Sequence, residues 1–164
     1  MKVLLAFYSK TGNTEKLANK IIKYLSSVQG VEIVIHKVVP PQDYKLPYLN
    51  PRVLKDALSK EGTPDVEGVD VSEFDLVIVA APTWFERPAP PIIGFVEKSR
   101  GYEGKKAVAI TTSISARSVY AKRLAEKLRE RGFDVVGWYS LKKSDLPEEV
   151  ADELKKLVSS EKAG

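Results

Sequence analysis

The residues whose types best suit chemistry lie near the N-terminus, in the hydroxyl-rich stretch Ser9 to Thr14, between an apolar run and an amphipathic segment. Its three hydroxyl side chains can donate hydrogen bonds, Gly12 accepts a backbone geometry that a Cβ would resist, and Asn13 tolerates a left-handed conformation. If a helix follows directly, the unpaired N–H groups of its first turn and the positive end of its dipole also favour an anion at this position. The stretch therefore predicts an anion-binding loop suited to a phosphate monoester.

An ordinary turn with Thr14 as the N-cap of the helix is the alternative interpretation of this stretch. The stretch has neither the Walker pattern Gly-x-x-x-x-Gly-Lys-[Ser/Thr] nor the dinucleotide pattern Gly-x-Gly-x-x-Gly. The run before it ends in Tyr8 and Ser9 instead of acidic residues, which disfavours a phosphoacceptor receiver domain. The chain has no cysteine, which excludes cysteine phosphatases, thiol redox chemistry and disulfides.

The elements that must position this loop follow from periodicity. Apolar, β-rich runs predict five strands, and amphipathic stretches between them predict helices. The strands are expected at about residues 4–8, 31–39, 75–81, 107–112 and 134–140, and helices at about 14–28, 50–61, 91–99, before Gly132, and from Pro147 onward. Such alternation implies right-handed crossovers and an α/β fold, a three-layer α/β/α sandwich with a five-stranded parallel sheet of order 2-1-3-4-5.

This topology places three loops at one edge of the sheet. Ligands of such folds bind outside the carboxyl ends of the strands, at the switch point between strands 1 and 3. The loops that begin at Ser9, Pro82 and Ser113 all start there. The second loop, Pro82 to Pro91, is rich in proline and carries two adjacent large aromatic residues. An anion loop beside an aromatic loop suits a ligand with a phosphate at one end and a flat ring system at the other.

Composition limits the class of protein. A chain of 164 residues with 43% hydrophobic content fits one domain, spanning residues 1–164. The net charge is +4, but 22 acidic residues are interspersed with 26 basic ones, so no nucleic-acid contact is predicted. Apolar runs are too short for membrane insertion and no signal peptide is evident, which favours a cytoplasmic protein. His36 is the only histidine, so no histidine metal cluster is expected and a surface or edge position is favoured.

The pattern Ser-x-Thr-Gly-x-Thr directly after an N-terminal strand resembles the phosphate loop of the flavodoxin family, which holds the phosphate of flavin mononucleotide (FMN). The segment Ala-Pro-Thr-Trp at residues 81–84 is similar to the family's aromatic loop after its third strand, and the order of elements agrees along the whole chain. The resemblance implies that Trp84 stacks on the flavin ring, that Phe85 seals an edge, and that backbone groups of the second and third loops meet the ring's polar edge and the ribityl chain. The alternative is that both aromatic residues pack against the helix that follows. The implied FMN-binding residues are Ser9, Lys10, Thr11, Gly12, Asn13, Thr14, Pro82, Thr83, Trp84, Phe85, Arg87, Thr112, Ser113, Ile114 and Ser115.

The sequence departs from the family in two places. The usual glycine beside the aromatic residue is absent from Phe85-Glu86-Arg87, and the loop after the fourth strand has Arg117 and no aromatic residue before Tyr120. If Arg87 and Arg117 face the flavin, they favour its negatively charged reduced form, which argues against a strongly reducing electron shuttle. They favour an acidic redox partner or an anionic substrate instead. Solvated surface arginines are the alternative.

The favoured function is electron transfer through non-covalently bound FMN, with a redox partner protein or a small redox substrate. The flavin supplies the chemistry, so no catalytic side chain and no metal are expected. The alternatives are an NAD(P)H-dependent FMN or quinone reductase, and a flavin-free module that binds a phosphate ligand or a partner. A homo-oligomer is compatible with all three.

Overall fold

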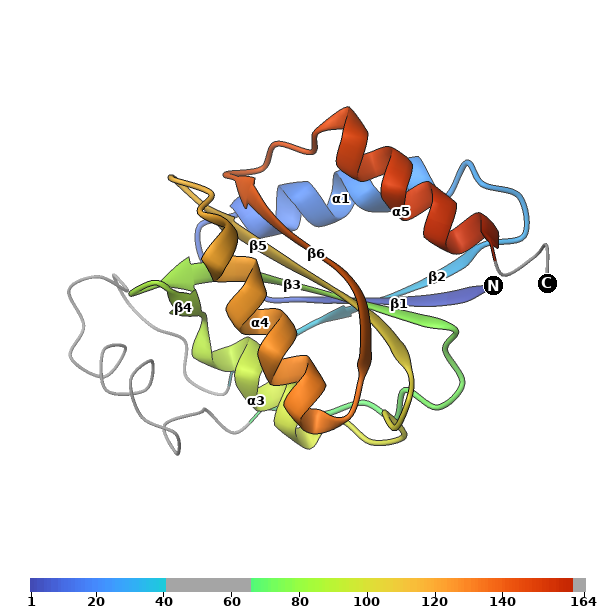
Figure 1. Cartoon of the computed structure of the whole chain (residues 1–164), viewed down its shortest axis with the longest axis horizontal. Coiled ribbons are helices and arrows are strands. Elements are labelled where there is room, and N and C mark those ends of the chain that lie inside the picture. Colours follow the sequence, from blue (N-terminus) through green and yellow to red (C-terminus); the bar gives the residue numbers. More distant parts are fainter. Residues whose placement is uncertain (41–65, 161–164) are drawn as a thin grey trace.

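Five parallel strands form the centre of the molecule in the computed structural model, which describes residues 1–40 and 66–160. Their spatial order is β2-β1-β3-β5-β6 (Figure 1), which is the predicted order 2-1-3-4-5 counted over the parallel strands. The fold prediction is therefore confirmed, while the helix expected at about residues 50–61 lies outside the described residues. The strands span Lys2–Phe7 (β1), Glu32–Lys37 (β2), Leu76–Trp84 (β3), Lys106–Ser113 (β5) and Asp134–Lys142 (β6).

Within residues 1–40 and 66–160, two helices cover each face of this sheet. Helices α1 (Asn13–Leu25) and α5 (Glu148–Ser160) lie on one face, and α3 (Pro90–Lys98) and α4 (Ser118–Arg131) lie on the other (Figure 1). Successive side chains of a strand point to opposite faces, so a strand covered on both sides is apolar throughout. In β1, Leu4 packs toward α3 and α4, while Leu5 packs toward α1 and α5. This alternation divides the core into two clusters and produces the predicted three layers.

The second loop was only partly predicted. β3 continues through Trp84, and a short strand β4 (Arg87–Pro88) turns back antiparallel to it, with Thr83 opposite Pro88. Phe85 and Glu86 form the turn with φ values of 50° and 63°, as a two-residue type I′ hairpin requires at both central positions. The prediction of a loop over residues 82–91 is therefore wrong at both ends. The usual signal for such a turn, Asn-Gly or Asp-Gly, is missing, and the neighbouring prolines suggested a loop.

His36 lies on the edge strand β2, where its ring stacks on Phe95 with centroids 5.3 Å apart. Burial lowers the pKa of His36 below its ordinary value, more than the nearby Glu67 raises it. A lowered folded-state pKa means that the unfolded chain binds the proton more readily, so stability should fall as the pH drops below about 6.5. Urea unfolding at a series of pH values should show this loss, and His36→Gln should remove it because no other histidine is present. Equal slopes in both proteins in this pH window would contradict the prediction.

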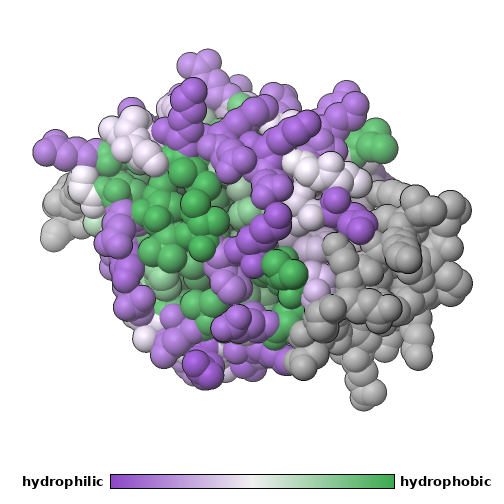
Figure 2. Space-filling model, turned by 180° about the vertical axis from the view of Figure 1, so that it is seen from behind, coloured by the Kyte–Doolittle hydropathy of each residue, from purple (hydrophilic) through white to green (hydrophobic). Residues whose placement is uncertain are grey.

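Apolar side chains remain exposed along one edge of the sheet. Within residues 1–40 and 66–160, β2 pairs only with β1, and Ile35 and Val39 are exposed on and just after it. Seen from behind, the molecule shows an area of apolar side chains among hydrophilic ones (Figure 2). Across the part of the chain that the structure describes, no helix combines the length and apolar character needed to cross a bilayer. A homo-oligomer stays one of the assemblies that the sequence allows, and exposed apolar side chains at a sheet edge favour association.

Candidate functional site at the carboxyl edge of the sheet

The predicted anion loop joins β1 to α1. Gly12 is the N-cap of α1 and has φ = 98°, a conformation that favours glycine. Its N–H donates to Ser9 Oγ at 3.1 Å, and its carbonyl accepts the first helical bond from Lys16 N–H at 2.9 Å. Helix α1 begins at Asn13, so the left-handed conformation that Asn13 would tolerate is adopted by Gly12 instead. The backbone N–H groups of the first turn of α1 therefore point toward the loop, as an anion site requires.

Thr14 does not cap the helix. Its side chain is 1% exposed, and its Oγ1 lies 2.8 Å from Thr112 Oγ1 at the end of β5. This hydrogen bond joins the end of the first predicted loop to the last residue of the predicted strand 107–112, across 98 residues of sequence. The interpretation of Thr14 as an N-cap is therefore wrong. Its buried hydroxyl holds the loop against β5, whereas Ser9 and Thr11 are more exposed.

The ends of β1, β3 and β5 bring the three loops to one edge. Tyr8 N–H donates to the Ala80 carbonyl at 3.3 Å, and Pro82 lies opposite Thr112 in the sheet. The structure thus places the first, second and third loops next to one another, as the topology predicted. Pro82, Thr83 and Trp84 belong to β3 itself, so their backbone positions are fixed by the sheet more firmly than loop residues would be.

Trp84 is part of the core. Its side chain is 3% exposed, and the ring meets Tyr8 edge to face, with centroids 5.7 Å apart and planes at 85°. Ala89 and Phe95 belong to the same cluster, so Trp84 packs against the helix that follows, as the alternative interpretation of this residue proposed. A ring this deeply buried presents little surface to a ligand. Tyr8, which the sequence did not single out, links the ends of β1 and β3 through this contact.

Phe85 and Ile114 are the more accessible apolar side chains of the predicted site. Phe85 is partly buried at the tip of the hairpin, and Ile114 is 76% exposed directly after β5. The loop that carries Ile114 is held by short-range bonds: Ser113 Oγ accepts the Ala116 N–H at 2.8 Å, and the Ser113 carbonyl accepts the Lys143 N–H at 2.8 Å. Ser115 is exposed in the same loop. These side chains, more than Trp84, form the apolar surface of the edge.

Two arginines hold the hairpin tip. Arg117 pairs with the Glu86 carboxylate at 3.1 Å, and the Arg123 guanidinium donates to the Glu86 carbonyl. Arg117 is thus engaged by Glu86, while Arg87 is exposed on β4. Sequence reasoning missed Arg123 because nothing in a helical arginine indicates a backbone carbonyl as its partner. The contact restrains two residues in left-handed conformations that non-glycine residues rarely adopt.

Replacing Arg123 by glutamine is expected to loosen this hairpin without unfolding the protein. The change removes a charge-assisted bond worth about 1.5 to 3 kcal/mol at most, and solvent exposure reduces that value. The backbone N–H of Ala89, which bonds the Pro82 carbonyl across the hairpin at 2.9 Å, should exchange its hydrogen faster. Lys122→Gln, one position earlier on the same helix, serves as the control. Unchanged exchange in Arg123→Gln would show that the turn holds its conformation unaided.

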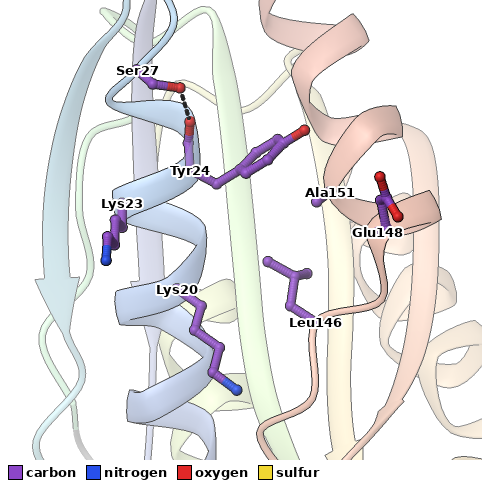
Figure 3. A pocket seen from close by; sticks show the side chains of 7 residues that line it. All are labelled: Lys20, Lys23, Tyr24, Ser27, Leu146, Glu148 and Ala151. Atoms are coloured by element: carbon purple, nitrogen blue, oxygen red, sulfur yellow. Dashed lines mark hydrogen bonds between the residues drawn. The ribbon is translucent and has the colours of Figure 1, made fainter.

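A separate pocket of about 490 Å³ lies between α1 and α5. Figure 3 shows the Tyr24 ring reaching from α1 toward α5, with Leu146 and Ala151 on the opposite side. Two polar groups of this pocket are engaged, since Lys20 Nζ donates to the Ser144 carbonyl and Tyr24 Oη to Asp152 Oδ1, each at 2.7 Å. It contains none of the predicted site residues, so the carboxyl edge remains the candidate site.

Comparison with solved structures agrees with this fold, although no protein-family model matches the sequence. A flavoprotein of Lactobacillus acidophilus, solved in complex with FMN, is 21% identical over 96% of this chain and 99% of that chain, with a TM-score of 0.68. Oxidised flavodoxin 2 of Bacillus cereus is 20% identical over the full length of both chains, with a TM-score of 0.60. Two-electron reduced flavodoxin of Megasphaera elsdenii is 15% identical over 96% of this chain and 98% of that chain, with a TM-score of 0.58. The chain therefore has the flavodoxin-like fold.

Proposed function

We propose that this chain binds FMN non-covalently at the carboxyl edge of its sheet and transfers electrons through it. The observation that carries the proposal is the loop from Ser9 to Thr14, which opens α1 at a left-handed Gly12 and is bonded to the end of β5 through Thr14. In this fold the loop lies at the switch point of the sheet, where such ligands bind. The FMN complex of the Lactobacillus acidophilus flavoprotein supports the same cofactor.

The residues of the loop fit the phosphate of FMN. Thr11 is exposed at the turn and can donate its hydroxyl to a phosphate oxygen, and Ser9 can share its hydroxyl between the Gly12 N–H and the ligand. A Cβ placed on Gly12 would meet no atom within 4 Å, so the space above the loop is open. The first-turn N–H groups and the dipole of α1 favour the dianion, and Lys10 adds a positive charge.

The ring of FMN would meet the second and third loops. Phe85 and Ile114 offer apolar contacts, and backbone groups of Thr83, Thr112 and Ser113 lie beside them. Bound FMN supplies one- and two-electron redox chemistry, so the chain has only to bind it, orient it and set its environment. Arg87 and Arg117 increase the positive charge near the ring and stabilise a negatively charged reduced cofactor.

Titration of the purified protein with FMN tests the proposal. We expect a flavin absorption spectrum with quenched fluorescence and saturable binding that Thr11→Ala weakens by about 1 to 3 kcal/mol. Lys23→Ala, on the outward face of α1, should bind as the wild type does. A colourless protein that keeps its fold and ignores FMN would contradict the proposal and favour the flavin-free binding module.

Electron transfer and reductase activity are separated by steady-state assay. An electron-transfer protein loaded with FMN should show negligible oxidation of NADH or NADPH with a quinone as acceptor, yet be reduced by dithionite and reoxidised by ferricyanide. Sustained turnover of NAD(P)H would contradict the electron-transfer proposal and favour an NAD(P)H-dependent reductase.

A further inference from the structure

The charges of the connecting segments differ between the two edges of the sheet. At the carboxyl edge, the segments at residues 8–12, 85–88, 113–117 and 142–147 contain five cations and two carboxylates. At the amino edge, the segments at residues 26–31, 70–75, 99–105 and 132–133 contain two cations and four carboxylates, and the side chains of Lys2 and Arg131 and the terminal amine of Met1, which contact these segments, balance the carboxylates. The connecting segments of the carboxyl edge therefore carry a net positive charge, which the balanced composition of the whole chain does not reveal. The cations of the carboxyl edge, named here the basic rim, are Lys10, Arg87, Arg117, Lys142 and Lys143.

The basic rim continues across neighbouring elements. Lys142 lies opposite Ser113 in the sheet, and the Lys143 N–H bonds the Ser113 carbonyl at 2.8 Å, so the end of β6 adjoins the loop after β5. In that loop, Arg117 reaches the hairpin tip through its 3.1 Å contact with Glu86. Arg87 is the next residue of the hairpin. The positive charges therefore surround the ends of β3, β5 and β6 and are not scattered over the surface.

The ion pair between Arg117 and Glu86 leaves the rim accessible. The two side chains are 62% and 58% exposed, so water and salt screen their attraction. Arg87, Lys142 and Lys143 are exposed as well. Ile114, with 76% of its surface exposed, lies in the same loop as Arg117 and directly after Ser113, whose carbonyl accepts the Lys143 N–H. An apolar side chain surrounded by charged ones resembles the core and polar rim of a protein interface.

We infer that the basic rim is the docking surface for an acidic redox partner protein. Cations spread over three strand ends match an extended acidic face, whereas a small anion would require them to converge on one point. The net positive charge of the basic rim raises the rate of encounter with a negative partner. The inference rests on the proposed function only in taking the docked partner to exchange electrons there.

An acidic polymer probes this surface directly. The isotope-labelled protein is titrated with poly-L-glutamate, and backbone amide signals are followed by NMR at low and at high ionic strength. We expect shifts in residues 85–88, 113–117 and 142–145, none at residues 70–75 or 99–105, and loss of binding at high salt. The triple variant Arg87→Gln, Lys142→Gln, Lys143→Gln should bind about tenfold more weakly. Shifts spread over the whole surface would overturn the inference.

A charge-matched control and a second probe complete the test. The triple variant Lys23→Gln, Arg129→Gln, Lys156→Gln removes three exposed cations from α1, α4 and α5 and should bind poly-L-glutamate within about twofold of the wild type. An equal loss in both variants would mean that net charge alone governs binding, and would overturn the inference. A single-stranded oligonucleotide that bound the same amides more tightly than poly-L-glutamate would also overturn it.

The polymer titration requires no flavin, so the two proposals can fail independently. If poly-L-glutamate bound at the rim but the protein did not bind FMN, the docking surface would be supported and the proposed function contradicted. If the protein bound FMN but poly-L-glutamate did not bind at the rim, the proposed function would be supported and the docking surface contradicted. With FMN bound, a positive rim attracts the anion ferricyanide and repels the cation hexaamminecobalt(III). Added salt screens both effects, so reoxidation of the reduced protein should become slower with ferricyanide and faster with hexaamminecobalt(III). The opposite salt dependence would contradict a positive rim.

Discussion

Replacing Trp84 by alanine is expected to lower the free energy of unfolding by about 3 to 5 kcal/mol, the usual cost of removing a large buried aromatic side chain. The ring is 3% exposed and packs edge to face against Tyr8. Its removal would leave a cavity between β1, β3 and α3, because the surrounding core cannot collapse fully. Urea unfolding followed by circular dichroism measures the loss. We also expect weaker FMN binding, since Tyr8 directly precedes the Ser9 loop.

Two further variants show whether burial causes this loss. Trp84→Phe keeps an aromatic ring in the site and should recover much of the stability. Trp138→Ala removes the other tryptophan of the chain, which is 37% exposed on the edge strand β6, and should cost clearly less than Trp84→Ala. If Trp84→Ala left stability unchanged and only shifted the flavin spectrum, the residue would be a ring-stacking group and not a core residue.

The five-strand order could be predicted because hydrophobic periodicity reports core packing directly. In the segment Leu76 to Ala81, six successive buried residues leave no surface face, and only a parallel strand covered by helices on both sides accounts for that. The limits of β3 could not be predicted. Trp84 follows Pro82 and Thr83, which suggested a loop, yet antiparallel pairing with Arg87 and Pro88 extends the strand. That pairing is a tertiary contact, and local sequence carries little information about it.

The candidate site was predicted in its backbone more than in its side chains. The glycine at position 12 was expected to adopt an unusual geometry, and its φ of 98° agrees. The burial of Thr14 was not predictable, because its partner Thr112 is distant in sequence and a hydroxyl near a helix start normally suggests a cap. Arg123 and Tyr8 were missed for the same reason. Their roles depend on what faces them across the fold.

The hydrogen bond between Thr14 and Thr112 gives the second large prediction. Both hydroxyls are buried, so removing one leaves the other desolvated without this partner, at a cost of about 1 to 3 kcal/mol. Thr14→Val and Thr112→Val should each lower the free energy of unfolding by that amount. The double variant should lose much less than the sum of the two, since two methyl groups can pack where two hydroxyls bonded.

A double-mutant cycle, with FMN affinity measured alongside stability, distinguishes positioning from direct binding. Thr11 is exposed, so Thr11→Ala should weaken FMN while leaving unfolding nearly unchanged. Thr14→Val should reduce both, because the buried hydroxyl holds the loop against β5. If the double variant regained stability but still bound FMN weakly, the Thr14 hydroxyl would act on the ligand itself. If it regained both, joining the loop to β5 would be the whole role of the pair. Additive losses in stability would show that the two hydroxyls do not depend on each other.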